Sequence, residues 1–210
     1  MAIRWTMPVA IALLASGPAS AASRQSSVER RLAAMTPAQF QARTTLQDDD
    51  LDTVATITTA NGFVERRPLL GPALDDVFLR AFIDKTTGRT AYQAYVILRY
   101  RGYGWANWDT ANYATPAGPR AIATQRIARL KASCPRGFAC LRSETVGFAI
   151  AAPVLKASAR LSVGDGTTSW PFKITAQNGT ERAFLLSTAE IAGLSMAVDA
   201  YRADRHLPIL

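Results

Sequence analysis

The chain has 210 residues, nearly half of them hydrophobic, and a formal net charge of +8. This length suits one domain with a buried core, and no stretch after the N-terminus is long and apolar enough to span a bilayer as a helix. Most of the basic residues occur singly along the chain, for example at Arg80, Arg99, Arg126 and Arg160. Such spacing indicates weak attraction to anionic surfaces and points to no particular partner.

Residues 1–21 have the three parts of a secretory signal peptide. Arg4 is the positive residue, Val9 to Ala15 form a short apolar run, and Ala19-Ser20-Ala21 is a small-residue cleavage site. Cleavage after Ala21 leaves 189 residues with a net charge of +7, because Arg4 is the only charged side chain removed. The short apolar run is typical of bacteria, so we expect a soluble protein in the periplasm or the medium.

Residues 22–50 are predicted to form an N-terminal arm of one or two short helices. The segment Thr36-Pro37-Ala38-Gln39 matches a capping box with proline at the first helical position. The adjacent acids Asp48 to Asp50 favour an exposed, extended end to the arm. The arm has too few apolar residues to be a second domain.

Residues 51–210 are predicted to form a single β-rich domain with a C-terminal helix. Period-two alternation of side chains and turn residues between the runs indicate antiparallel strands. The expected strands cover 77–84, 90–101, 120–131, 141–150, 159–163, 169–176 and 180–186, although 120–131 could also be helical. Ser187 to Glu190 match a second capping box, and the helix after it has an apolar stripe of Ile191, Leu194, Val198 and Tyr201.

These elements predict a mainly β fold, a sandwich or an open barrel of antiparallel strands, with short N-terminal helices and a terminal helix on the sheet. The sequence gives no indication of oligomeric state.

The two cysteines, Cys134 and Cys140, predict a disulfide bond. An even cysteine count in an exported chain favours a structural bridge, and Pro135 and Gly137 allow the chain to reverse between the two. Redox pairs of the thioredoxin type have two intervening residues, whereas this pair has five. Because His206 is the only histidine, we expect no metal site, and no sequence motif indicates a cofactor.

No segment matches a catalytic motif, so no catalytic residue is assigned. The remaining alternative is a hydrolase of cell-envelope polymers that uses two carboxylates, with Glu144 as one of them. Glu144 could instead form a cross-strand ion pair with Arg126 or Arg129. The candidate partner acids are Asp75, Asp76, Asp84 and Asp109.

An aromatic loop between two predicted strands is the candidate ligand-binding site. Its residues are Tyr103, Trp105, Asn107, Trp108 and Asp109, within the segment 101–109. Aromatic rings beside short polar groups suit a glycan or a peptide, because rings stack while polar groups fix orientation. The alternative is that the two tryptophans close the end of the sandwich. We therefore expect an envelope protein or glycan as partner, and export argues against nucleic acid.

Several segments resemble exported bacterial proteins of unknown function. The resemblance rests on Phe78–Gly88, Ala91–Val96, Ser143–Gly147 and Ile191–Asp199, and it extends over about residues 75–200. It implies the same export and fold class. It transfers no catalytic residue, because no position in these segments is chemically diagnostic.

Overall fold

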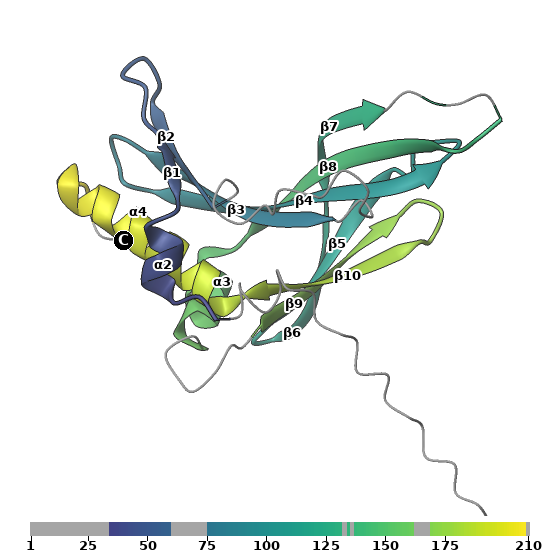
Figure 1. Cartoon of the computed structure of the whole chain (residues 1–210). Helices are drawn as coiled ribbons and strands as arrows, with labels where there is room; N and C mark the ends of the chain where they lie inside the picture. The colour runs from purple at the N-terminus through teal and green to yellow at the C-terminus, as the bar shows by residue number, and fades with distance from the viewer. Residues whose placement is uncertain (1–33, 60–74, 132–133, 135–136, 162–168, 209–210) are drawn as a thin grey trace, which may run out of the picture.

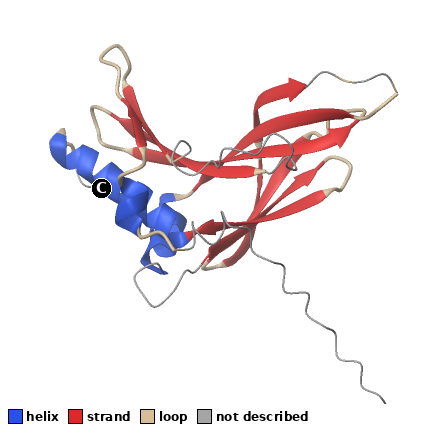
Figure 2. Ribbon diagram, in the orientation of Figure 1, coloured by secondary structure: helices blue, strands red, loops and turns tan. Residues whose placement is uncertain are grey.

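The computed structural model describes residues 34–59, 75–131, 134, 137–161 and 169–208. These residues form two antiparallel sheets and three helices (Figures 1 and 2). The predicted signal peptide, residues 1–21, lies outside the described residues. The predicted mainly antiparallel β fold with a C-terminal helix is confirmed.

The six-stranded sheet has the strand order β1-β2-β3-β4-β8-β7, and the four-stranded sheet has the order β10-β9-β5-β6. All neighbouring strands are antiparallel. The strands of the larger sheet are β1 (Thr45–Gln47), β2 (Val54–Thr58), β3 (Asp76–Asp84), β4 (Thr90–Gly102), β7 (Gln125–Lys131) and β8 (Cys140–Ile150). Those of the smaller sheet are β5 (Trp108–Thr115), β6 (Gly118–Ala123), β9 (Ser169–Ala176) and β10 (Glu181–Ser187).

One face of the six-stranded sheet is covered in two parts. In Figure 1 the four-stranded sheet lies beneath the β8–β7 side and the helices lie beneath the β1–β3 side. Contacts of β5 with β7 and β8, and of α4 (Thr188–Asp204) with β2 and β3, agree with this arrangement. A single hydrophobic core therefore runs under the four central strands of this sheet, β2, β3, β4 and β8. Its fully buried side chains come from both sheets and α4, and they include Leu79, Val96, Leu98, Ile174, Ile191 and Leu194.

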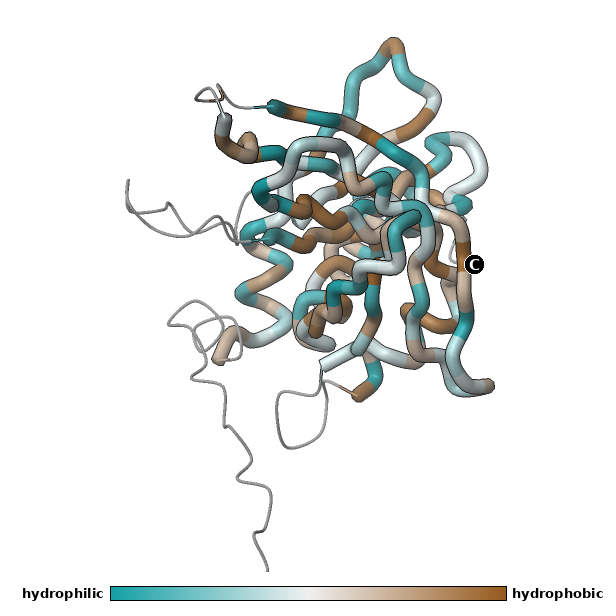
Figure 3. Tube along the Cα trace, turned by 90° about the vertical axis from the view of Figure 1, so that its right-hand side faces the viewer, coloured by the Kyte–Doolittle hydropathy of each residue, from teal (hydrophilic) through white to brown (hydrophobic). Residues whose placement is uncertain are grey.

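The alternation of side chains explains why β3 and β4 lie in this sheet. Leu79, Ala81 and Ile83 on β3 are fully buried in the core, and their neighbours in the sequence point to the other face. In Figure 3 hydrophobic and hydrophilic residues accordingly alternate over short distances along the strands. The turn between the strands is held by Asp84, whose Oδ1 accepts hydrogen bonds from Thr86 N at 3.0 Å and Thr87 N at 2.7 Å. These hydrogen bonds, that of the Thr87 amide first, lower the pKa of Asp84.

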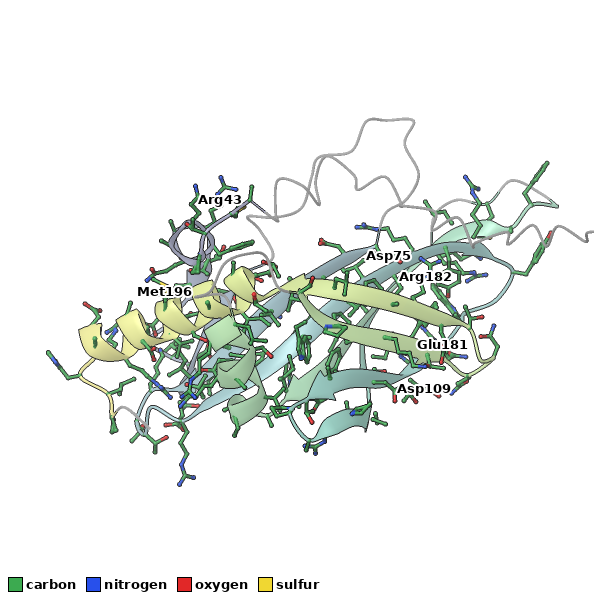
Figure 4. The ribbon with its side chains drawn as sticks, turned by 90° about the horizontal axis from the view of Figure 1, so that it is seen from below. Arg43, Asp75, Asp109, Glu181, Arg182 and Met196 are labelled. Atoms are coloured by element: carbon green, nitrogen blue, oxygen red, sulfur yellow. A yellow bond between two sulfur atoms is a disulfide. The ribbon has the colours of Figure 1, made fainter. Side chains whose placement is uncertain are left out.

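The predicted N-terminal capping box is confirmed in α2 (Pro37–Gln41). Thr36 Oγ1 accepts from Gln39 N at 3.3 Å, and Gln39 Oε1 accepts from Thr36 N at 2.9 Å. This short helix contacts α4 through Phe40, which is fully buried. The stripe predicted on α4 is also buried, and Met196 lies off it on the outer side of the helix (Figure 4).

Two predicted strands differ from the structure. The strand predicted at 159–163 is wrong, because Ala159 and Arg160 end α3 (Ala152–Arg160), where Pro153 stands in the first helical turn. The run 120–131 is two strands: β6 and β7 belong to different sheets and meet at Thr124. Thr124 N donates to Asp109 O at 2.8 Å, and this bond fixes the corner between the sheets.

Two local predictions near the chain ends also need correction. The predicted helical arm contains β1, which pairs with β2 and so belongs to the six-stranded sheet. At the start of α4, Ser187 accepts from Ala189 N at 3.2 Å as expected of a cap. Glu190, however, points into the core, where its Oε1 accepts from Thr59 Oγ1 at 2.6 Å.

Candidate functional site

The candidate loop connects β4 to β5 at the end of the six-stranded sheet, directly over the side chain of Glu144. Strand register positions this residue, since Glu144 pairs with Leu98 on β4 and with Arg129 on β7. Alternation along β8 then turns Glu144 to the same face as the core residues Val146 and Phe148. A carboxylate is therefore placed between the sheet and the loop, with only 1% of the residue exposed.

Five donors surround the Glu144 carboxylate. Oε1 accepts from the Tyr100 hydroxyl, from Ala106 N at 2.9 Å and from Asn107 N at 3.2 Å. Oε2 accepts from Arg129 Nε at 3.1 Å and from Arg129 Nη2 at 2.9 Å. Both carboxylate oxygens are thus engaged, and the Arg129 guanidinium, with two N–H groups on Oε2, balances the charge. The predicted cross-strand ion pair is confirmed for Arg129.

Tyr100 links the carboxylate to the loop a second time. Its hydroxyl donates to Glu144 and accepts from Ala106 N at 2.8 Å. Burial, followed by the hydrogen bond to Glu144, raises the pKa of Tyr100 to about 12. The phenol therefore stays protonated at physiological pH, so it remains a donor to the carboxylate.

Two arginines of the sheet contact the indole ring of Trp105 in the loop. The guanidinium carbons of Arg129 and Arg142 lie 4.9 and 4.6 Å from the ring centroid of Trp105, within cation–π distance. Arg142 also donates to Gly102 O at 3.0 Å and to Tyr103 O at 2.6 Å. The sheet thus fixes both the backbone of the loop and its indole ring.

The five predicted ligand-binding residues lie in different surroundings. Tyr103 is 80% exposed, Trp105 and Asp109 are half-buried, and Trp108 is only 4% exposed. Trp108 packs edge-on against Tyr100, with ring centroids 6.3 Å apart, and belongs to the core. The rim formed by Tyr103 and Trp105 is therefore the part of the loop that a partner can reach.

Asn107 gives the loop its sharp bend. Its φ of 55° lies in the left-handed region, which asparagine tolerates better than most residues. Its side-chain oxygen accepts from Arg129 Nη2, and its carbonyl accepts from Gln177 N at 3.1 Å. Asn107 therefore ties the loop to both sheets rather than offering a free amide to a ligand.

Arg182 joins the two sheets beside the loop. It forms an ion pair with Asp75, and the two side chains lie next to each other in Figure 4. Asp75 Oδ1 also accepts from Arg99 N at 2.7 Å, and the Arg182 guanidinium lies 5.9 Å from the Trp108 ring centroid. Asp75 therefore has a structural partner, as Glu144 has.

The predicted disulfide bond between Cys134 and Cys140 is present. It closes the connection between β7 and β8, and Gly137 within it adopts a φ of 79° that favours glycine. Cys140 pairs with Gly102 at the end of β4. The bridge therefore lies at the end of β8 that pairs with the last residue of β4, next to the start of the candidate loop.

Metal-binding side chains do not gather in the part of the chain that the structure describes, where no three of His, Cys, Asp or Glu could share an ion. Asp48, the first of the three adjacent acids, instead forms ion pairs with Lys85 at 2.5 Å and Arg205 at 2.6 Å. The hydrogen bond from Lys85 is the main cause that lowers the pKa of Asp48. Among the same described residues, no helix has the length and apolar character to cross a membrane.

The fold and this site define an antiparallel two-sheet protein with a buried carboxylate beneath its β4–β5 loop. No protein family matches the chain, and neither a curated protein nor a solved structure is significantly similar to it. The resemblance to exported bacterial proteins stays a prediction from the sequence.

Sequence reasoning did not find Tyr100 or Arg142 as parts of the site. A signal for Arg142 was present, since it stands two residues before Glu144 and so shares its face of β8. Tyr100 belongs to the apolar face of β4, and only the tertiary structure shows that its hydroxyl meets a carboxylate.

Proposed function

We propose that this chain is an exported bacterial binding domain without catalytic activity, which contacts a protein or a glycan of the cell envelope through the rim of the 101–109 loop. The signal-like residues 1–21 and the disulfide bond support export to an oxidising compartment. The loop supplies aromatic side chains beside arginines, which suit a partner with acidic or polar groups.

The hydrogen bonds that the Glu144 carboxylate accepts are the main observation in support of this proposal. Its two oxygens accept hydrogen bonds from five donors. Three of these donors, the Tyr100 hydroxyl and the amides of Ala106 and Asn107, belong to residues 100–107, so the carboxylate holds this segment in place. A loop fixed before binding loses little conformational entropy when a partner docks, which favours a binding role.

The same contacts weigh against a hydrolase that uses Glu144. A general acid or nucleophile must reach the substrate, whereas this side chain is 1% exposed and paired with Arg129. Asp75, one of the candidate partner acids, is itself paired with Arg182. We therefore prefer binding over hydrolysis of envelope polymers as the function.

Capture from a bacterial envelope extract tests the proposal. The oxidised protein is immobilised, and retained glycan and protein are measured by sugar analysis and mass spectrometry. The double variant Tyr103→Ala/Trp105→Ala should lose the retained partner. The matched variant Leu161→Ala/Leu185→Ala, at exposed positions outside the loop, should keep it.

Equal retention by both double variants would contradict the proposed site. Melting temperatures of the variants separate loss of binding from loss of fold. Release of soluble sugar from envelope polymers by the wild type, abolished in Glu144→Gln while the fold is kept, would instead support the hydrolase.

A further inference from the structure

The positive charge of the chain is concentrated in one segment. Residues 85–143 contain ten Lys and Arg and a single acid, Asp109, so this segment has a formal charge of +9. The rest of the chain sums to −1, since the total is +8. The individual arginines are spaced along the sequence, but only one acid lies between them, so the segment is strongly basic.

The fold gathers part of this charge at one end of the six-stranded sheet. Gly102 at the end of β4 pairs with Cys140 at the start of β8, and Lys131 at the end of β7 pairs with Arg142. Arg101, Tyr103, Leu130, Lys131 and Phe138 therefore lie at or just beyond the last paired residues of three adjacent strands. We call these five residues the basic tip. Figure 1 shows that this end of β7 and β8 lies away from the helices.

Large apolar side chains are exposed at the basic tip. Tyr103 is 80% exposed, Leu130 is 70% exposed and Phe138 is 69% exposed. Single exposed apolar residues are common on proteins, but three of them at one projecting end indicate an interaction surface. The exposed Arg101 and Lys131 beside them form no ion pair among the described residues.

The combination of side chains identifies the kind of surface that fits. Lys and Arg are attracted to anionic lipid headgroups, while aromatic and aliphatic side chains enter the boundary between headgroups and acyl chains. An acidic glycan would pair with Arg101 and Lys131 but would give Leu130 and Phe138 no apolar surroundings. A bilayer surface provides both environments, with anionic headgroups for the charges and an acyl boundary for the apolar side chains.

Two contacts hold described parts of the tip before it meets a partner. The disulfide bond closes the β7–β8 connection, and Arg142 fixes the loop that carries Tyr103 through the carbonyl of that residue. Docking then requires little reordering of the loop that carries Tyr103.

We propose that the basic tip docks on the surface of an anionic lipid bilayer and inserts Tyr103, Leu130 and Phe138 at the headgroup boundary. This contact shares Tyr103 with the proposed capture of a protein or glycan, but it needs neither Trp105 nor an envelope ligand, and the variants that test it leave Tyr103 in place. It would seat the domain beside the membrane with the helices directed away from the lipid.

Cosedimentation with vesicles tests this proposal. The oxidised protein is mixed with vesicles of phosphatidylglycerol and phosphatidylcholine in equal amounts, or of phosphatidylcholine alone. We expect binding to the anionic vesicles only, and weakening by added salt. The variant Leu130→Ser/Phe138→Ser should bind at least about tenfold more weakly. The variant Arg101→Gln/Lys131→Gln should weaken binding by about fivefold for each charge removed.

Matched variants control for total hydrophobicity and charge. Leu161→Ser/Leu185→Ser removes two exposed apolar side chains elsewhere, and Arg89→Gln/Arg160→Gln removes two exposed charges away from the tip. Both should bind nearly as the wild type does. Equal binding to the two kinds of vesicle, or equal losses in tip and control variants, would overturn the proposal. So would binding to soluble dextran sulfate without binding to vesicles, which would point to an acidic glycan instead.

Discussion

At the scale of single residues, Glu144 shows how a charged group is kept in the interior of this protein. Removal of a carboxylate from water costs several kcal/mol, and the cost is offset only when charge and hydrogen bonds are both balanced. Arg129 provides the opposite charge, and Tyr100 with two loop amides provides the remaining donors. The same contacts give the loop its shape, so stability and the form of the proposed binding rim are coupled.

Glu144→Ala should therefore lower the free energy of unfolding by about 3–5 kcal/mol, because it leaves Arg129 and the loop donors without their acceptor. Chemical denaturation measures this loss. Glu181→Ala is the matched control, since Glu181 forms an ion pair with Lys173 at the surface and should contribute less than about 1 kcal/mol. Similar losses in the two variants would show that the Glu144 contacts contribute little.

Glu190 predicts a pH dependence of stability. Burial raises the pKa of this carboxyl to about 8, from 4.5 in an exposed chain, and the nearby Asp76 adds to the increase. The folded protein thus keeps a proton that the unfolded chain releases between pH 4.5 and 8, so stability falls as the pH rises through this window.

Glu190→Gln should remove this fall, because the amide oxygen can still accept from Thr59 and carries no charge. The variant should match the wild type near pH 4 and exceed its stability by up to about 3 kcal/mol at pH 7. Denaturation at several pH values measures the difference, with Glu181→Gln as the exposed control. A difference that stays constant between pH 4 and 8 would contradict the assignment.

At the scale of elements, the contact between α2 and α4 depends on a glycine. A Cβ on Gly193 would lie 2.5 Å from Phe40 Cβ, 2.7 Å from Pro37 O and 2.9 Å from Gln41 N. Two of these atoms belong to the backbone of α2, so the short helix would have to move. The N-terminal segment is held on the domain through this close approach.

Gly193→Ala should destabilise the protein by about 1–3 kcal/mol, although alanine is the better helix former by about 1 kcal/mol. Thermal unfolding measures the change. Met196→Ala, on the exposed side of the same helix, should be nearly neutral and serves as the control. An increase in melting temperature for Gly193→Ala would show that α2 does not pack on α4 as described.

Elements with a local signal in the sequence could be predicted, whereas those that depend on tertiary contacts could not. The β3–β4 hairpin, the strand β8 and the helix α4 were predictable, because alternation, turn glycines and an apolar stripe all act locally. The strand predicted at 159–163 failed because short apolar runs fit a helix equally well. The break at Thr124 was missed, since the change from one sheet to the other is a tertiary choice that leaves the polarity pattern of β6 and β7 similar.

At the scale of the whole molecule, two sheets and a helix share one core, and the candidate loop lies at the end where the two sheets meet. The sequence predicted the loop residues as a cluster, but it could not separate the buried Trp108 from the exposed Tyr103. It predicted an ion pair of Glu144 with Arg126 or Arg129, but it could not show that the Tyr100 hydroxyl and the loop amides meet the same carboxylate. Their distance in the sequence hides the contact that the sheet register creates.

Hydrogen–deuterium exchange at the 100–107 segment tests the central claim, that Glu144 holds the candidate loop in a fixed shape. The amides of Ala106 and Asn107 should exchange slowly in the wild type and rapidly in Glu144→Ala, while β9 and β10 keep their protection under conditions where both proteins are folded. Rapid exchange of these two amides in the wild type would contradict the account, because a loop that is not fixed by Glu144 could not present a preformed binding rim.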